Sequence, residues 1–371
     1  MKTKSTPSKL KLHIKPAEFK QRVTKWFKLH GRKDLPWQQN PTPYRVWISE
    51  IMLQQTQVNT VIPYYLKFME KFATLESLAK ATDDEVMALW SGLGYYSRAR
   101  NLHKTALLIS NDLNSLPEDL DDLVALPGIG KSTAGAILAL SMDKKAAILD
   151  GNVKRVLARY FQISGWPGEA GVLKKLWQLA EILTPDFSVK DHSVKNYTQA
   201  MMDLGATICT RSKPACTSCP LSQSCLANKD GDQLNYPGKK KKKILPIKQQ
   251  NYYLITNDNS EILMEKRPNT GIWGGLWTPL SCAQDIHANG NKADGFLLEE
   301  FGIKISDPAR LPEFRHTFSH FHLQITPIKA KLKGFTGIHE TKLSWDSIEN
   351  WLERGIPAAV RTMLLQYKDL N

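Results

Sequence analysis

The sequence lacks the features that would place it in a membrane or a secretory class. No uninterrupted apolar run is long enough to cross a bilayer. The first 15 residues are basic but have no apolar core of a secretory signal, so we expect residues 1–15 to be a disordered lead-in. Cysteine is scarce, with five in 371 residues. We therefore expect a cytoplasmic protein, in which paired disulfides are rare.

Acidic residues are outnumbered, with 36 against 50 lysines and arginines, which leaves a formal net charge of +14. Such an excess indicates a polyanionic partner, although general surface charge would also explain it. The apolar content of 42% excludes wholesale disorder. A chain of this length is expected to form about two or three domains.

Strand signals are absent before Lys229. Apolar residues instead recur at helical spacing, which predicts helices over residues 16–28, 64–72, 82–90 and 99–111. A further helix begins at Ser49 or a few residues earlier. The first two-thirds of the chain is therefore predicted to be mostly helical.

A glycine-punctuated turn, Leu-Pro-Gly-Ile-Gly at residues 126–130, precedes a predicted helix over residues 132–140. Gly128 and Gly130 let backbone N–H groups point outward together at a helix N-terminus, which is a phosphate site. Lys131 adds a positive charge, and Ser132 follows it. The plainer interpretation is two packed helices joined by a Pro-Gly turn.

Two carboxyl groups are candidates for a catalytic pair. Glu50 stands among Trp47, Ile51 and Leu53, and such neighbours raise a carboxyl pKa and favour a general acid. Asp150 lies at a predicted helix start beside Asn152, where it would stay ionised. The alternative for Glu50 is an exposed helix glutamate.

The strongest single signal is Cys209, Cys216, Cys219 and Cys225, with the spacing C-x6-C-x2-C-x5-C. Four of the five cysteines in one short stretch predict a metal site. The spacing leaves zinc and a [4Fe–4S] cluster both open. The fifth, Cys282, is expected to be a buried thiol.

The composition changes after Cys225. Residues 228–250 form a predicted basic linker with five consecutive lysines at 239–243, which either lie along phosphates or form a solvated tether. From residue 251 short strand patterns appear at 252–256, 262–266 and 323–332, with helices near 295–301 and 346–354. Residues 251–371 are therefore predicted to be an α+β domain.

Two loops carry aromatic residues that suit base contacts. Tyr95 stands in a glycine-rich loop as a candidate wedge for a base stack, with Arg98 and Arg100 as candidate phosphate contacts. In the second domain, Phe318, Ser319 and His320 combine a ring with hydrogen-bonding groups. A packed turn and a strand end with surface histidines are the respective alternatives.

Together, the segment Ser49-Glu50-Ile51-Met52-Leu53-Gln54-Gln55-Thr56, the hairpin turn, Leu149-Asp150-Gly151-Asn152 and the cysteine spacing resemble the MutY-type adenine DNA glycosylases. This family of helix-hairpin-helix enzymes is related to endonuclease III. The resemblance covers roughly residues 19–365. It implies a multidomain protein: a mostly helical glycosylase domain over residues 16–227, with a [4Fe–4S] loop at 209–225, and then a Nudix-like domain.

The resemblance also implies roles for single residues. Glu50 would act on adenine N7, and Asp150 would support the sugar cation. The four cysteines would hold the [4Fe–4S] cluster. DNA contacts would come from Gln55, Tyr95, Gly128, Gly130, Lys131, Ser132, Asn152, Phe318, Ser319 and His320, and the base pocket from Trp37, Val58 and Gln199.

The implied substrate is duplex DNA carrying adenine opposite 8-oxoguanine or guanine. The implied enzyme is a monofunctional, monomeric, nucleoid-associated protein of a bacterial type, with downstream repair proteins as further candidate partners. The Nudix catalytic signature is incomplete, since the chain keeps Glu299, Glu300 and Gly302 but lacks the arginine-glutamate pair before them and the upstream glutamate. A binding role for this domain is therefore favoured.

Two rivals remain. An endonuclease III-like lyase would carry a lysine where this chain has Ser132. A non-catalytic DNA-binding protein would not need the pairing of Glu50 with Asp150.

Overall fold

The structure is a computed structural model that describes residues 12–113, 115–186, 193–240, 244–283, 293–336 and 343–370. The chain divides into two compact units that do not follow its order. Unit 1 comprises residues 1–55 and 112–241, and unit 2 comprises residues 56–111 and 242–371. Parts of the predicted lead-in (1–11) and of the lysine run (241–243) lie outside the described residues. None of the described helices has the length and apolarity needed to span a membrane.

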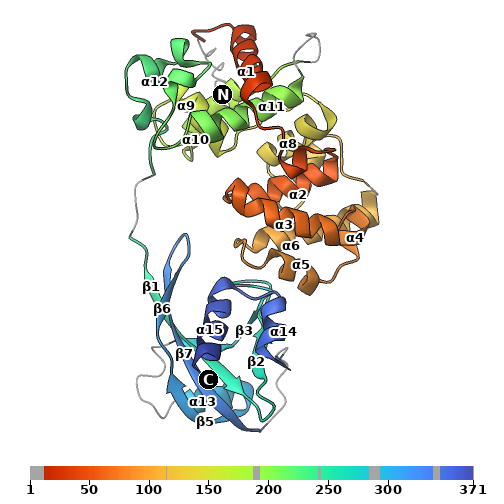
Figure 1. The fold of residues 1–371 in the computed structure, drawn as a ribbon, viewed down its shortest axis with the longest axis vertical. Helices are drawn as coiled ribbons and strands as arrows, with labels where there is room; N and C mark the ends of the chain where they lie inside the picture. The colour runs from red at the N-terminus through yellow and green to blue at the C-terminus, as the bar shows by residue number, and fades with distance from the viewer. Residues whose placement is uncertain are drawn as a thin grey trace, which may run out of the picture. The chain divides into compact units, whose positions relative to one another are not determined.

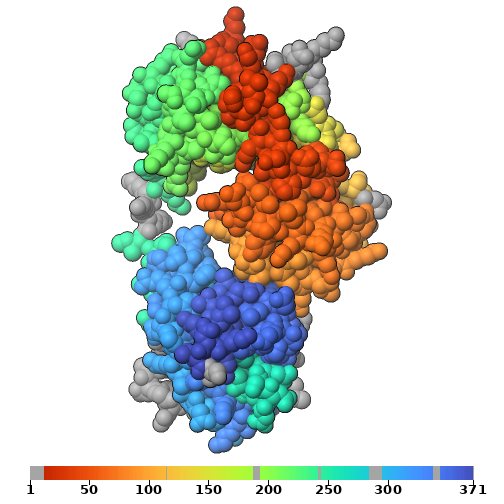
Figure 2. Space-filling view, in the orientation of Figure 1, coloured from red at the N-terminus to blue at the C-terminus, as the bar shows by residue number. Residues whose placement is uncertain are grey.

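In unit 1, helix α1 (Pro16–His30) begins with Pro16, whose fixed φ suits the first helical position. Its buried stripe includes Phe19, Val23 and Phe27 and packs against α11 (Val194–Asp203) and α10 (Ala170–Leu183). The red and green surfaces of these segments adjoin one another (Figures 1 and 2). This prediction of an amphipathic helix is confirmed.

Helix α2 (Pro43–Leu53) begins at Pro43, where the Thr42 side chain accepts a hydrogen bond from the Arg45 N–H group. Ser49 therefore lies inside the helix and does not cap it. Helix α2 packs against α8 (Lys131–Met142), a helix of small and apolar residues that follows α7 (Leu120–Ala125) and the hairpin turn. A Cβ at Gly135 would lie 2.3 Å from the Ala147 carbonyl oxygen, so only glycine lets α8 approach the segment before Asp150 so closely.

Helix α9 (Gly151–Tyr160) and a run of short helical turns complete unit 1. The first of these turns precedes α2, and the others lie within residues 204–235, the part of the chain that contains the four cysteines. They are η1 (Pro36–Gln38), η3 (Leu204–Ile208), η4 (Cys216–Ser218), η5 (Ser222–Ser224), α12 (Leu226–Lys229) and η6 (Gln233–Asn235).

The helical part of unit 2 has two capped starts. Thr74 caps α4 (Leu75–Ala79) and Thr82 caps α5 (Asp83–Trp90), each by accepting a backbone hydrogen bond three residues later. The other helices are α3 (Val58–Lys71), α6 (Ser97–Leu108) and the turn η2 (Ile109–Leu113). Phe68 and Trp90 pack edge to face in the interior, 6.2 Å between ring centroids.

The rest of unit 2 is a mixed sheet with helices. Strands β1 (Ile247–Thr256) and β7 (His322–Phe335) run parallel at its centre, and the strand order is β3-β2-β1-β7-β5. The remaining elements are β2 (Ile262–Lys266), β3 (Trp277–Thr278), β4 (Leu280–Ala283), β5 (Ile303–Arg310), β6 (Phe314–Thr317), β8 (Leu343–Asp346), α13 (Ala293–Phe301), α14 (Ile348–Glu353) and α15 (Ala358–Asp369) (Figure 1).

One apolar core lies on this sheet. Leu263 and Leu280 pack there with Leu297 and Phe301 of α13. The predicted α+β second domain is therefore confirmed, as is the predominantly helical character of the preceding part of the chain. Five strands, β3, β4, β5, β6 and β8, and helix α15 were not predicted.

Candidate active site, cysteine loop and aromatic turn

Glu50 lies in the last part of α2, flanked by the buried residues Ser49 and Ile51. The carboxyl group is half-buried. Loss of hydration raises its pKa to about 8, and the charge of Asp150 raises it further in the same direction. Glu50 is therefore protonated at neutral pH, as the sequence suggested for a general acid.

Asp150 is the N-cap of α9. Its Oδ1 accepts a hydrogen bond from the Val153 N–H group at 2.8 Å, and its Oδ2 accepts one from Asn152 Nδ2 at 3.1 Å. Burial raises the pKa of Asp150, while these donors and the nearby Arg155 charge oppose that change. The charge of Asp150 acts on Glu50 and favours its protonated form. Asp150, which accepts hydrogen bonds from Asn152 and Val153, carries the negative charge.

Ser132 holds the backbone next to Asp150. Its hydroxyl accepts a hydrogen bond from the Leu149 N–H group at 3.0 Å. Lys131, in contrast, forms an ion pair with Glu181 at 2.7 Å and lies 4.4 Å from the centre of the Trp177 ring. A contact between Lys131 and a phosphate would require that it leave Glu181.

The hairpin turn has the backbone geometry of an anion site. Gly128 has a φ of +79°, which favours glycine, and Gly130 is the N-cap of α8. Nothing lies within 4 Å of the place where a Gly130 Cβ would stand. Ile129 between them is 3% exposed and anchors the turn. The turn thus presents open backbone N–H groups at the start of a 12-residue helix.

Trp37 and Gln199 line one cavity of about 190 Å³ in unit 1, together with Ser49, the neighbour of Glu50. The structure thus brings together two of the three predicted base-pocket residues. The third, Val58, is the first residue of α3 and belongs to unit 2.

Arg155 is a residue that the sequence reasoning missed. It donates from Nη2 to Asn152 Oδ1 at 2.9 Å and from Nε to the Cys209 carbonyl oxygen at 2.6 Å. It therefore connects the partner of Asp150 to the first cysteine. Arg155 stands three residues after Asn152, one helical turn, and this spacing was the available signal.

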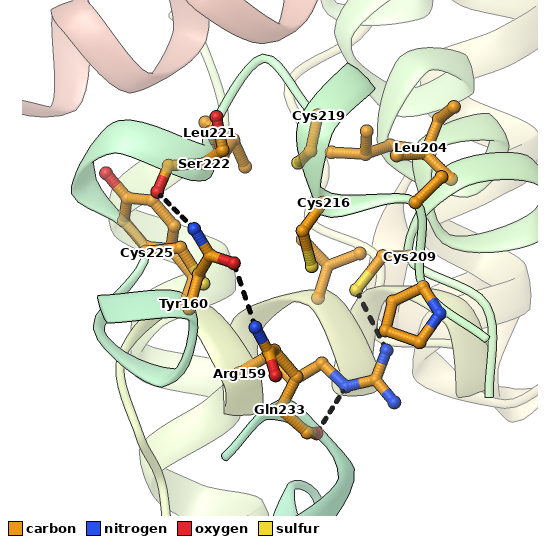
Figure 3. A pocket seen from close by; sticks show the side chains of 15 residues that line it. Arg159, Tyr160, Leu204, Cys209, Cys216, Cys219, Leu221, Ser222, Cys225 and Gln233 are labelled. Atoms are coloured by element: carbon orange, nitrogen blue, oxygen red, sulfur yellow. Dashed lines mark hydrogen bonds between the residues drawn. The ribbon is translucent and has the colours of Figure 1, made fainter. Parts of the chain in front are cut away.

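The four cysteines surround one hollow (Figure 3). All four are half-buried and free of disulfides. No three His, Cys, Asp or Glu side chains in the described ranges lie close enough together to hold a single metal ion. Cys282 is 3% exposed and contacts the Tyr253 hydroxyl, so its prediction as a buried thiol is confirmed.

Arg159 supports the cysteine loop from below. Its side chain is buried and donates from Nη1 to Cys209 Sγ at 3.3 Å and to the Thr210 carbonyl oxygen at 2.7 Å (Figure 3). Burial raises the pKa of the Cys219 thiol to about 12, and the other cysteines add to this. The raised pKa keeps the Cys219 side chain a neutral thiol unless a bound metal centre removes the proton.

Two predicted DNA-contacting residues have a left-handed backbone. Gln55 has a φ of +58° and Tyr95 a φ of +50°, and both side chains are exposed. Such strain in non-glycine residues gathers at functional sites. The phosphate role expected for Arg98 is wrong, because Arg98 is 8% exposed and donates to the carbonyl oxygens of Leu93 and Gly94. Arg100 likewise donates to the Gly274 carbonyl oxygen.

Phe318, Ser319 and His320 form the turn between β6 and β7. The Phe318 ring stacks on Phe321 at 4.5 Å and lies 5.8 Å from the Trp273 ring, while Ser319 and His320 are exposed. All three line a cavity of about 690 Å³ that Tyr95 also lines within unit 2. The structure thus brings the two aromatic loops of the sequence to one cavity.

Two family models match the chain. Residues 48–181 match the HhH-GPD superfamily of base excision DNA repair proteins, and residues 251–366 match the NUDIX domain. A solved structure of a thermostable thymine-DNA glycosylase is 31% identical, with a TM-score of 0.52, and aligns with 58% of this chain and 97% of its own.

Curated relatives match over nearly the whole length. The adenine DNA glycosylase of Buchnera aphidicola from Schizaphis graminum is 39% identical over 94% of this chain and 99% of its own. The adenine DNA glycosylase of Homo sapiens is 31% identical over 86% of this chain and 68% of its own. With identity of this extent and a helix-hairpin-helix domain that holds two paired carboxyl groups, the chain belongs to the adenine DNA glycosylases, the DNA N-glycosylases of base excision repair.

Proposed function

We propose that this glycosylase removes adenine opposite 8-oxoguanine or guanine in duplex DNA and leaves the abasic strand uncut. The observation that carries the proposal is the division of charge between Glu50 and Asp150. One carboxyl group is protonated near neutral pH, and the other accepts hydrogen bonds from Val153 and Asn152. Cleavage of an N-glycosidic bond needs both states at once.

In this mechanism Glu50 delivers its proton to N7 of the adenine, so that the base leaves as a neutral species. Positive charge then develops on the sugar, and the Asp150 carboxylate offsets it. The Asn152 amide and the Val153 N–H group keep Asp150 oriented. Water completes the hydrolysis at the sugar carbon.

DNA binding rests on three features of the described chain. The hairpin turn, with Gly128 and Gly130 at the start of α8, takes a phosphate. Gln55 and Tyr95, both exposed and both in a strained backbone, enter the stack where the adenine leaves it. The base-pocket role that the resemblance implies for Val58 stays a prediction.

Reading of the opposite base is assigned to residues 251–371, and to Phe318, Ser319 and His320 in particular. Their ring and polar groups line a cavity of about 690 Å³, which is large enough for a base. The incomplete Nudix signature at Glu299 and Glu300 supports a binding role for this domain.

Monofunctional action rests on Ser132. A lyase step requires an amine that forms a Schiff base with the sugar, and a serine hydroxyl cannot form one. The Ser132 hydroxyl instead accepts a hydrogen bond from the Leu149 N–H group. Lys131 is engaged with Glu181.

Cys209, Cys216, Cys219 and Cys225 would hold a [4Fe–4S] cluster. The donor set fits, because each iron of such a cluster takes one thiolate, and the four sulfurs surround one hollow without closing on a single-ion site. Zinc with four thiolates would require them all at about 2.3 Å from one point. When bound, the cluster would cross-link the loop and supply an electron-exchange centre.

Purified protein should therefore be brown and contain about four irons per chain, as a cluster with four thiolate ligands requires. Cys216→Ser should lower the iron content and the melting temperature together. Iron analysis, the visible spectrum and thermal denaturation measure these effects. Colourless protein that contains zinc and keeps its stability would contradict the cluster.

The proposed function is tested with duplexes that carry adenine opposite 8-oxoguanine, guanine or thymine. We expect fast excision for the first two and slow excision for thymine. Strand breaks should appear only after alkali treatment. Release of a pyrimidine in preference to adenine, or strand breaks without alkali, would overturn the proposal.

A further inference from the structure

Asp203, at the end of α11, is a buried carboxylate surrounded by donors. Its side chain is fully buried. It accepts hydrogen bonds from Arg32, through the backbone N at 2.8 Å, Nε at 3.0 Å and Nη2 at 2.6 Å. A fourth comes from Gln199 Nε2 at 3.0 Å. The mechanism proposed above does not use this group, yet it holds Arg32 and Gln199, which both line the cavity of about 190 Å³.

The contact with Asp203 fixes the orientation of the Gln199 amide. An ionised carboxylate only accepts hydrogen bonds, so the NH₂ end of the amide must face Asp203. The carbonyl oxygen, Oε1, is then left for the cavity that Gln199 lines together with Trp37. Within the described ranges, Gln199 Oε1 receives no hydrogen bond from another side chain.

Arg32 stabilises the buried Asp203 carboxylate. An unpaired carboxylate in the interior is strongly unfavourable, and the Arg32 guanidinium, which donates two hydrogen bonds to Oδ1, offsets its charge. The cavity therefore gains an oriented acceptor without gaining a net negative charge from Asp203.

We propose that Asp203 is a positioning residue that sets the choice of base through Gln199. Adenine presents a 6-amino donor, which Gln199 Oε1 accepts, whereas guanine and hypoxanthine present a 6-oxo acceptor, which it repels. The inference rests on the proposed function, because it requires that the excised adenine enters the cavity lined by Trp37 and Gln199. Asp203 itself does not touch the substrate.

The test measures excision of adenine and of hypoxanthine, each placed opposite 8-oxoguanine, by single-turnover kinetics. Asp203→Asn offers a donor where the carboxylate stood, so the Gln199 amide can turn over. We expect the adenine-to-hypoxanthine ratio to fall at least about tenfold, since loss of an oriented hydrogen-bonding group is a large specificity effect. Gln199→Met should narrow the same ratio, and the double variant should add little to it.

A purely structural role would lower the active fraction for both bases equally and leave the ratio unchanged. Ser193→Ala provides the matched control, because it removes the N-cap of the same helix without touching Asp203. It should lower the melting temperature and preserve the ratio. If Asp203→Asn does not fold, Asp203→Glu keeps the charge for Arg32 but displaces the acceptor of Gln199, and it should also narrow the ratio.

An unchanged ratio in a folded Asp203 variant, or full additivity with Gln199→Met, would overturn the inference. Failure of the proposed function is a separate result, because the parent protein would then not prefer adenine at all. The two failures are therefore distinguishable in one experiment.

Discussion

At the residue scale, the active site depends on how two neighbouring carboxyl groups share one negative charge. Asp150 has hydrogen-bond donors on both oxygens, whereas desolvation and the charge of Asp150 hold the proton on Glu50. The roles are therefore set by surroundings, since both side chains have the same chemistry.

The pH dependence of excision follows from this division. The pKa of Glu50 is raised to about 8, so the acid is present below that pH and is lost as the pH rises through it. The pKa of Asp150 is raised above its ordinary value of 3.8. As the pH falls, Asp150 therefore becomes protonated and loses its charge, and the excision rate should fall. Single-turnover rates should form a bell with its upper limb near pH 8. A rate that keeps rising beyond pH 9 would contradict Glu50 as the acid.

Glu50→Gln separates catalysis from stability. It should retain duplex binding and lose excision by about 100-fold or more, as expected for removal of a general acid. A carboxyl with a raised pKa stabilises the fold below its unfolded pKa of about 4.5 and progressively less up to about 8. The melting temperature of the variant should therefore exceed that of the parent at pH 9 but not at pH 4. Equal melting differences at both pH values would show that Glu50 is not desolvated.

Ser132→Lys tests the direction in which this position faces. Ser132 binds the backbone beside Asp150, so an amine there would reach the same sugar. The start of α8 also disfavours an ammonium. We expect strand cleavage without alkali and a borohydride-trapped complex, with weaker adenine excision. Lys131→Ala is the control that should not nick. A folded variant with no trapped complex would mean that Ser132 faces away from the sugar.

Several residues of the site could be predicted from the sequence, and others could not. The sequence predicts Glu50 and Asp150 because each stands in a motif with apolar or helix-start neighbours, and in the structure the charge of Asp150 acts on Glu50. The left-handed φ of Gln55 and Tyr95 and the burial of Arg98 were not predicted, because none of these residue types favours these states and the sequence pattern gives no sign of them. Asp203 was missed for the same reason, since its main partner is Arg32.

At the element scale, α9 links the cysteine loop to the active site. Arg155 on this helix donates to the Cys209 carbonyl oxygen and to Asn152, which in turn donates to Asp150. A Cβ at Gly205 would lie 2.5 Å from Asn152 Cβ, so η3 also presses on Asn152. The position of Asp150 therefore depends on two further segments, the cysteine loop and η3.

Arg155→Ala should slow adenine excision at least tenfold while the protein stays folded, because the loss of a buried charged hydrogen bond costs about 1.5–3 kcal/mol. The measurement is the single-turnover rate together with iron content. Lys154→Ala is the matched control on the same helix and should change the rate much less. Loss of iron with an unchanged excision rate would show that Arg155 stabilises the cysteine loop and does not position Asp150.

The predicted elements agree with the structure where periodicity is long. Helix α1 and strand β2 match their predicted positions, because each has a sustained apolar pattern. Strand β3 has only two residues, and β6 and β8 have four each, so no period could be detected. The start of α2 at Pro43 was missed because Thr42 and not Ser49 provides the cap.

At the scale of the whole molecule, the proposed function assigns base excision and reading of the opposite base to separate parts of the sequence. The HhH-GPD match contains Glu50 and Asp150, and the NUDIX match contains Phe318 to His320. A change in the second part should therefore alter selectivity more than chemistry.

Replacement of Phe318, Ser319 and His320 by alanine should leave adenine excision measurable. The preference for 8-oxoguanine over guanine as the opposite base should fall about tenfold or more, since each lost contact to a base is worth about 1–3 kcal/mol. Excision rates on the two duplexes give the ratio. Substitution of Gln324, which lies on β7 outside this cavity and bonds to Glu313, is a control for disturbance of the strands. A ratio equal to that of the parent would assign the second domain another task.

The division of the chain into two units affects how a nascent polypeptide can fold. Residues 56–111 belong to unit 2, so the chain leaves unit 1 after Gln55 and returns to it at Asp112. Glu50 is made one hundred residues before Asp150. At about 5–20 residues per second, Asp150 is therefore synthesised some seconds after Glu50. Each unit is built from separated stretches of chain, and neither can close around its apolar residues until the later stretch has emerged from the ribosome.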